Sequence, residues 1–545
     1  MAIAVHAASE FPVNASTQRR VALVGAGLGF VAFLLAMVGS RSNTLANGDE
    51  LYHLIAASSW LESGEFRVGE GEYDRASLYT RLVGVAYALF GESLASAKLV
   101  GALCFGLLVA AMHVVLYRVA GLTIALTATG LLAFSPHALE IASTIRFYMP
   151  QALLFWIGAW SAYGATYYKE HRPILVVLSV ATLGLALHFQ IATAIGIAAL
   201  VGWVGIQAAL ALAARCTRDQ LIVLGVVAAL VSMVAVAILP LEMLWDRYQS
   251  AALWNAGSDV RYYYWVMTED YNPFWGILPI CALLALYSNT RIAVFSAWIF
   301  GMCFVAHSFG GMKEDRYLFY AFPFFFLVIA LGLRSIFSIV ADVTGRLLEQ
   351  FKFLGARGRS FIAGSVAAGS IAFLVISNLG YVAAGKDLFS GNIKREQPDW
   401  ASMSQEYGDA LQNSSVLLTN TPLHVLYYLD RMPIGIGRNR LVTGGGGVEF
   451  AKDFRTGARL ISSVASIEKV LDCVPDGYLL VEERQWLQNS ATGIGAEMIP
   501  LIERRMQRVD VPEGWDIRAY SWKHEDVGPR DRKECSAALG SGASG

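Results

Sequence analysis

Adjacent carboxylates stand out in a sequence that carries few charges. Three such pairs occur: Asp49 with Glu50, Glu269 with Asp270, and Glu314 with Asp315. A carboxylate can take the proton of a hydroxyl group as a general base, or it can help to hold a divalent cation. Arg and Lys side chains nearby can hold an anionic leaving group such as a phosphate. These residue types indicate group transfer to a hydroxyl as one function of the loops that contain them.

Two of the pairs also have a structural explanation. Asp49 and Glu50 lie at a predicted helix start, where carboxylates satisfy free backbone N–H groups and the helix dipole. Lys313 and Arg316 flank the third pair, so this turn could neutralise itself through salt bridges. The sequence leaves both alternatives open.

Composition shows which kind of element must carry these residues. The chain has 545 residues, of which 55% are hydrophobic and 16% charged, and its mean hydropathy is +0.48. A soluble domain carries about 25% charged residues, so long uncharged stretches must be present and an ordinary soluble protein is excluded. The net charge of −1 argues against a nucleic-acid partner, which would need a basic stripe.

Long apolar stretches predict a polytopic α-helical membrane protein. A spanning helix needs about 20 apolar residues, and about eleven stretches approach this length. They are 21–40, 97–117, 120–135, 147–167, 173–188, 191–213, 220–240, 274–288, 292–309, 318–338 and 361–382. We therefore expect a membrane domain at 1–382.

Short basic turns indicate the orientation of these spans. By the positive-inside rule the N-terminus is cytoplasmic, and an odd number of spans places the tail outside. The outer side then receives four loops and the tail from residue 383 onward. The loops are 41–96, 136–146, 241–273 and 310–317, and they hold all three acid pairs.

After residue 383 the composition is that of a water-soluble domain. Val416–Asn420 and Gly477–Glu482 predict strands, Pro422–Leu429 predicts a helix, and 457–472 is amphipathic. We expect an extracytoplasmic α/β domain at 383–535 and a disordered tail at 536–545. The six cysteines show no CxxC or zinc spacing, and we interpret them as packing residues.

Four local patterns follow one another on the predicted outer face. They are Asp49-Glu50 with Tyr52, Gly91 followed by Lys98-Leu99, Ser135-Pro136 with Arg146-Phe147-Tyr148, and Lys313 to Tyr317 ahead of Phe322-Pro323. In this order they resemble the GT-C superfamily of integral-membrane glycosyltransferases. The resemblance covers about residues 40–330 and is strongest to the branch with the aminoarabinose transferases and protein O-mannosyltransferases.

The resemblance implies inverting transfer of a sugar from a polyprenyl-phosphate donor to a hydroxyl on the outer face of the membrane. It assigns Asp49 as the base, and Glu50 as a neighbour that tunes the base or shares a divalent cation with it. Candidates for holding the donor phosphate are Arg75, Arg81, Arg146, Lys313 and Arg316. Secondary site residues are Tyr52, His53, Tyr148, His307, Glu314 and Asp315.

The resemblance implies a protein of the bacterial inner membrane. Its implied partners are the bilayer, the lipid-linked donor and an acceptor in the cell envelope. The acceptor could be a glycolipid, a cell-wall or O-antigen glycan, or a protein. The chain has Arg75-Ala76-Ser77 where aminoarabinose transferases have Lys-Pro-Pro, so its donor head group or acceptor can differ. The alternative is a transporter or lipid flippase, which would carry ionisable residues deep within several spans.

Overall fold

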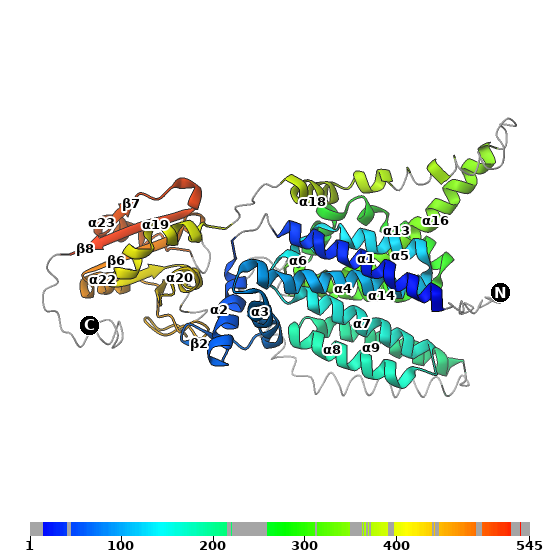
Figure 1. Cartoon of the computed structure of the whole chain (residues 1–545), viewed down its shortest axis with the longest axis horizontal. Helices are drawn as coiled ribbons and strands as arrows, with labels where there is room; N and C mark the ends of the chain where they lie inside the picture. Colours follow the sequence, from blue (N-terminus) through cyan, green and yellow to red (C-terminus); the bar gives the residue numbers. More distant parts are fainter. Residues whose placement is uncertain are drawn as a thin grey trace. The chain divides into compact units, whose positions relative to one another are not determined.

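The computed structural model forms two compact units (Figure 1). The first unit takes the described parts of Met1–Gly39, Gly101–Ser143 and Phe147–Gly391. The second takes those of Ser40–Val100, Thr144–Arg146 and Asn392–Gly545. The structure describes residues 15–40, 45–214, 220, 259–310, 313–348, 362, 364–366, 369, 372–390, 397–438, 441, 446–486, 493–524 and 535.

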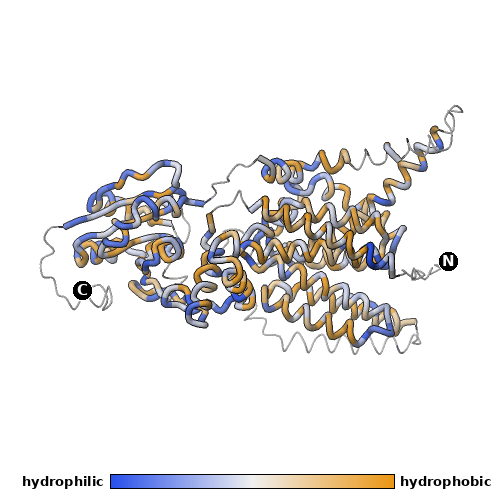
Figure 2. The backbone as a smooth tube through the Cα atoms, in the orientation of Figure 1, coloured by the Kyte–Doolittle hydropathy of each residue, from blue (hydrophilic) through white to orange (hydrophobic). Residues whose placement is uncertain are grey.

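The first unit is a helical bundle. Its described elements are α1 (Ala15–Gly39), most of α4 (Leu94–Ala120), α5 (Leu122–Ala133), α6 (Pro136–Ser143), α7 (Tyr148–Tyr167), α8 (Arg172–Phe189), α9 (Thr193–Ala213), α12 (Tyr262–Tyr271), α13 (Phe274–Ser288), α14 (Thr290–Phe309), α15 (Asp315–Leu318), the 3₁₀ turn η1 (Phe319–Ala321), α16 (Phe322–Leu348) and α18 (Leu379–Ser390). Figure 2 shows these helices as mostly hydrophobic along their length. The polytopic helical fold is thereby confirmed.

The predicted number of eleven spans is not confirmed. Within the described residues, six helices are long and apolar enough to cross a membrane. Two bent pairs raise this number to eight if each pair is one span: α5 with α6, bent by 58°, and α12 with α13, bent by 94°. The predicted span 220–240 lies outside the described residues except for residue 220, and 361–382 lies partly outside them.

Composition explains why α7 is not one of the six, because Gln151 and several Tyr and Trp residues lower its mean hydropathy. It covers the predicted span 147–167, but thirteen of its twenty residues are buried, and they include the polar Gln151. In α8, by contrast, most residues are accessible, and Ile174, Val177 and Val180 are among the most exposed large apolar side chains. A helix inside the bundle needs no lipid-facing surface, whereas an outer helix does.

Small residues let α1 and α4 approach closely. A Cβ atom on Gly29 would lie 2.5 Å from the carbonyl oxygen of Gly106, and one on Gly106 would lie 2.7 Å from that of Gly29. The backbones therefore touch at this crossing, as is common for membrane helices.

A mixed six-stranded sheet forms the centre of the second unit. Its strands are β3 (Val416–Thr419), β4 (Ile434–Ile436), β5 (Leu460–Ile461), β6 (Asp476–Glu482), β7 (Gln507–Val509) and β8 (Ile517–Lys523). The order is β5-β4-β3-β6-β8-β7, in which the first four strands are parallel and β8 is antiparallel to β6 and β7. Leu418, for example, lies opposite Ile434 on one side and Leu479 on the other.

Helices cover both faces of this sheet because side chains of a strand alternate between faces. On β6, Leu479 and Val481 join the core formed with α22 (Val464–Cys473) and α23 (Ile499–Arg505). Leu480 points to the other core, formed with α19 (Trp400–Asn413) and α20 (Pro422–Leu429). The predicted C-terminal α/β region is thus confirmed.

The segment after α1 belongs to the same unit as this sheet. It forms α2 (Gly48–Ser63), the short hairpin β1 (Arg67–Val68) and β2 (Gly71–Glu72), and α3 (Ser77–Phe90). Ala56, Val68 and Tyr73 form a small core with Leu423 and Leu426 of α20. The backbone N–H of Glu70 also donates to the carbonyl of Thr456 at 3.1 Å.

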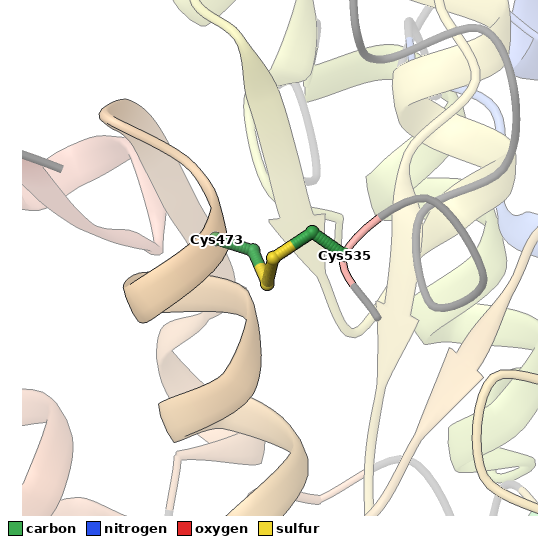
Figure 3. The surroundings of a disulfide bond; sticks show 2 residues. All are labelled: Cys473 and Cys535. Carbon is green, nitrogen blue, oxygen red and sulfur yellow. A yellow bond between two sulfur atoms is a disulfide. The ribbon is translucent and has the colours of Figure 1, made fainter. Parts of the chain in front are cut away.

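Two cysteines correct the prediction that all six are packing residues. Cys473, the last residue of α22, forms a disulfide with Cys535 (Figure 3). No sequence motif marks this pair, whose members are 62 residues apart. Cys281 and Cys303 are free and buried, as expected for packing residues. The predicted disordered tail 536–545 lies outside the described residues.

Candidate functional site

The start of α2 positions the first acid pair. Asn47 caps the helix: its side chain accepts from the N–H of Glu50 at 3.0 Å, while Glu50 Oε2 accepts from the N–H of Asn47 at 2.8 Å. Glu50 Oε1 accepts from the N–H of Ile145 at 2.7 Å, and Glu50 is 0% exposed. The capping alternative is therefore confirmed for Glu50, which also ties the segment Thr144–Arg146 to the helix.

Asp49 has different surroundings. Its Oδ2 lies 3.1 Å from Nη1 of Arg146, whose side chain is 5% exposed, whereas the Asp49 side chain is 47% exposed. The adjacent contact of Ile145 with Glu50 fixes the backbone that carries Arg146. One acid of the pair thus anchors the fold, and the other is an accessible carboxylate beside a buried guanidinium.

His53, one turn after Asp49, is fully buried, which disfavours a positive charge on its ring. Burial, together with Arg146 and Arg75, lowers the pKa of His53 well below its ordinary value. Its Nδ1 lies 3.0 Å from the Thr80 hydroxyl. It supports the site through hydrogen bonds and packing.

Two tyrosines, Tyr52 of α2 and Tyr73 after β2, pack together near Asp49 and His53. The rings of Tyr52 and Tyr73 stack with centroids 5.0 Å apart, and burial raises the pKa of Tyr73 to about 12. Arg75 and Arg81 are exposed, and the guanidinium of Arg81 lies 5.5 Å from the centroid of the Phe66 ring. Arg81 is thus engaged with an aromatic side chain near the hairpin.

A polar cavity of about 330 Å³ lies within the second unit and includes Asp49. It is lined by Gly48, Asp49, Tyr52, Gln397, Thr421, Pro422, Leu423, His424, Asp453, Arg455, Thr456, Glu482, Arg484 and Gln485. Only Asp49 and Tyr52 of this lining are residues that the sequence singled out. The contribution of the C-terminal domain was missed because it follows from the sheet order, which no motif encodes.

The other predicted residues lie in the first unit, around the start of α15 and α16. Lys313 donates to the carbonyls of Ser308 at 2.8 Å and Gly310 at 2.6 Å. Arg316 lies 5.8 Å from the ring centroid of Tyr148 and 4.0 Å from Glu314. The self-neutralising turn forms in part: Arg316 pairs with Glu314, while Lys313 donates to backbone carbonyls.

The buried His137 contacts one acid from each of the two remaining pairs. His137 Nε2 lies 3.1 Å from Asp315 Oδ2 and 3.6 Å from Asp270 Oδ2. Its Nδ1 lies 3.1 Å from the hydroxyl of Tyr271, which is 2.7 Å from that of Ser135. This network joins α6, α12 and α15. His137 lies in the predicted outer loop 136–146, and nothing local in the sequence links it to acids more than 130 residues away.

His307 is also part of the first unit's packing. Its Nε2 lies 3.1 Å from the Tyr320 hydroxyl, and its side chain is buried. Among the described residues, no group of three or more His, Cys, Asp or Glu side chains is placed to hold a metal ion. Both Glu50 oxygens accept backbone N–H groups.

Comparisons with known proteins were made for the whole chain. No protein-family model and no curated protein sequence matches it. Solved structures do: ArnT from Cupriavidus metallidurans bound to undecaprenyl phosphate has a TM-score of 0.60 at 16% identity, over 92% of this chain and 99% of that one. The chain shares the fold of ArnT.

Two further structures share this fold. ArnT of the same organism in the apo state has a TM-score of 0.56 at 16% identity, over 91% of this chain and 97% of that one. The oligosaccharyltransferase AglB from Archaeoglobus fulgidus, in complex with an inhibitory peptide and a dolichol-phosphate, has a TM-score of 0.54 at 13% identity. That match covers 90% of this chain and 72% of AglB. At these identities the likeness concerns the fold.

Proposed function

We propose that this GT-C protein is an inverting glycosyltransferase that moves a sugar from a polyprenyl-phosphate donor to a hydroxyl of an envelope acceptor. The observation that carries the proposal is Asp49: an accessible carboxylate, paired with the buried Arg146 and lining a polar cavity. The lipid phosphates named for ArnT and AglB support a donor of this class.

In this reaction Asp49 acts as the general base. The proton of the acceptor hydroxyl passes to the carboxylate while the acceptor oxygen forms a bond to the anomeric carbon. The bond from that carbon to the phosphate oxygen breaks on the opposite side, and the polyprenyl phosphate leaves with the electron pair. Arg75, Lys313 and Arg316 stay predicted ligands of the phosphate, whose negative charge needs fixed cations.

The proposed location is the inner membrane of a bacterium, with the N-terminus in the cytoplasm and the C-terminal domain outside. The Cys473–Cys535 disulfide supports this orientation because disulfides form and persist in oxidising compartments. The acceptor is proposed to be a glycolipid, a glycan or a protein that displays its hydroxyl on this side.

The test is Asp49→Asn in the purified full-length protein. Labelled polyprenyl-phosphate sugars serve as donors, and membranes from cells that lack the protein supply the acceptor. Loss of a general base should lower the rate about 100- to 10,000-fold. The melting temperature should stay near that of the wild type, since Asp49 is half exposed.

Glu72→Gln is the matched control, because it removes an exposed carboxylate from the same loop. It should leave transfer unchanged. Full activity of Asp49→Asn would refute the role of the base. If the lipid-linked sugar crosses the membrane without being transferred by the wild type, the protein is a transporter or flippase.

A further inference from the structure

The cavity beside Asp49 lies where the sheet of the second unit changes its winding. From β3 the chain passes through α20 on one face to β4, and after β6 it passes through α23 on the other face. The connections that follow the neighbouring parallel strands β3 and β6 therefore leave on opposite faces of the sheet. In open α/β sheets such a switch point forms a crevice in which ligands bind.

The cavity lining follows this rule. Thr421 and His424 come just after β3, and Glu482 and Arg484 lie at or just after the end of β6. The N–H of Glu482 donates to the side chain of Asn420 at 3.2 Å, which joins the two strand ends. The start of α2, with Asp49, lines the same space.

The acids of this lining have cationic or N–H partners. Asp453 Oδ1 accepts from the backbone N–H groups of Arg455 and Thr456. Glu482 lies 3.7 Å from Arg484, and Asp49 is paired with Arg146. Arg455, by contrast, has no carboxylate partner among the described residues.

The first turn of α20 also faces the cavity, and a helix N-terminus favours anions. Its residue His424 is 4% exposed, stacks on Trp400 and hydrogen-bonds with the backbone of Ala46. Arg455 is therefore the group of this lining that is left to pair with an incoming anion.

The loop that carries Arg455 is held rigidly. A Cβ atom on Gly71 would lie 2.2 Å from the Arg455 carbonyl oxygen, and one on Gly457 would lie 2.5 Å from Cβ of Glu70. Lys452 also pairs with Glu70. The hairpin β1–β2 therefore holds the backbone that carries Arg455 in place before a ligand binds.

We propose that this crevice binds a phosphate or carboxylate group of the acceptor, with Arg455 as its main cation and the α20 N-terminus as a further hydrogen-bonding group. The acceptor is then an anionic, hydroxyl-bearing sugar, held so that a neighbouring hydroxyl reaches Asp49. Its assignment to the acceptor rests on the proposed function of Asp49 as the base, whereas anion binding itself does not.

The experiment is calorimetric titration of the full chain in lipid nanodiscs. The probes are glucose 6-phosphate, glucuronate and the neutral methyl glucoside. At least one anionic probe should bind about tenfold or more tightly than methyl glucoside, and Arg455→Gln should remove this difference, because a charge-assisted hydrogen bond is lost. Arg455→Lys should restore part of it.

Arg504→Gln is the matched control, since it removes the same charge from α23 outside the cavity lining. It should bind like the wild type. Equal binding of methyl glucoside, or anion binding that Arg455→Gln leaves intact, would overturn the proposal. If undecaprenyl phosphate competes with the anionic probe, the assignment to the acceptor is overturned, and the crevice binds the phosphate of the donor instead.

Asp49→Asn separates this inference from the proposed function. It should keep Arg455-dependent binding of the anionic probe while transfer is lost. If the wild type transfers no sugar but binds the probe through Arg455, the proposed function fails and the anion site stands. If transfer depends on Asp49 but no probe binds, the proposed function stands and the anion site fails.

Discussion

Glu50 offers the sharpest test of how the site is built. Its buried carboxylate accepts the N–H groups of Asn47 and Ile145 at 2.8 and 2.7 Å. Glu50→Ala leaves both donors unsatisfied, at about 1–3 kcal/mol each, so the second unit should lose about 2–6 kcal/mol. For a unit of roughly 200 residues this corresponds to a melting temperature lower by about 4–24 °C.

Two milder variants calibrate this effect. Asn47→Ala removes only the capping acceptor of the Glu50 N–H and should cost about 1 kcal/mol. Glu50→Gln keeps the volume and one acceptor but turns an amide NH₂ toward the other donor, so its loss should lie between the two. Intrinsic fluorescence during heating of the purified protein gives the order, and transfer assays on the same samples give kcat and KM.

The kinetic expectation follows from the position of Arg146. When Ile145 is released, Arg146 loses its fixed place beside Asp49. The variant should therefore lower kcat by a larger factor than it changes the KM of either substrate. Glu50→Ala melting at or above the temperature of Asn47→Ala would refute the reasoning. So would a Glu50→Gln enzyme whose activity excess Mg²⁺ restores, because Glu50 would then be a cation ligand.

Two other predictions concern the second unit. Gly71→Val should push the hairpin away from the Arg455 carbonyl and lower both the melting temperature and the rate of transfer. Gly408→Ala is the control, because a Cβ atom at this position of α19 has no neighbour closer than 3.9 Å, and it should change neither quantity. Equal melting temperatures of the two variants would contradict the role of the hairpin in holding the Arg455 loop. Because the pKa of His53 is lowered in the folded state, its contribution is complete above pH 6.5 and declines as the pH falls below 6.5, where only the unfolded chain takes up the proton. His53→Gln should therefore flatten the fall in melting temperature between pH 6.5 and 5, and an unchanged slope would show that other groups cause it.

Local signals predicted the elements, and their success has a clear cause. The helix Pro422–Leu429 has the predicted bounds because Pro422 occupies its first turn and Asp430 leaves the helix in the left-handed region. The strands β3 and β6 differ from their predicted bounds by one residue at one end, since short apolar runs between polar residues define them. Such signals lie within one or two turns of the chain.

Long-range pairing could not be predicted in this way. Glu70 contacts Thr456 and Lys452, and His137 contacts Asp270 and Asp315, across separations that no periodicity or spacing records. The same is true of the crevice, which exists because β6 returns to the side of β3 opposite β4. The sequence therefore indicated Asp49 but not the domain whose strand ends surround it.

In each of the three acid pairs the two carboxylates have different surroundings, and this difference sets Asp49 apart as a candidate site residue. In each pair one acid is fixed by the fold: Glu50 by two N–H groups, and Asp270 and Asp315 by His137. The other acid stays accessible, and of these only Asp49 both faces a buried cation and lines the described cavity. A charged group near a membrane is costly unless it is paired, so a pair that anchors one carboxylate can present the second in a fixed place. A carboxylate that is fixed without being buried suits the base of the proposed reaction, which has to reach the proton of an incoming hydroxyl.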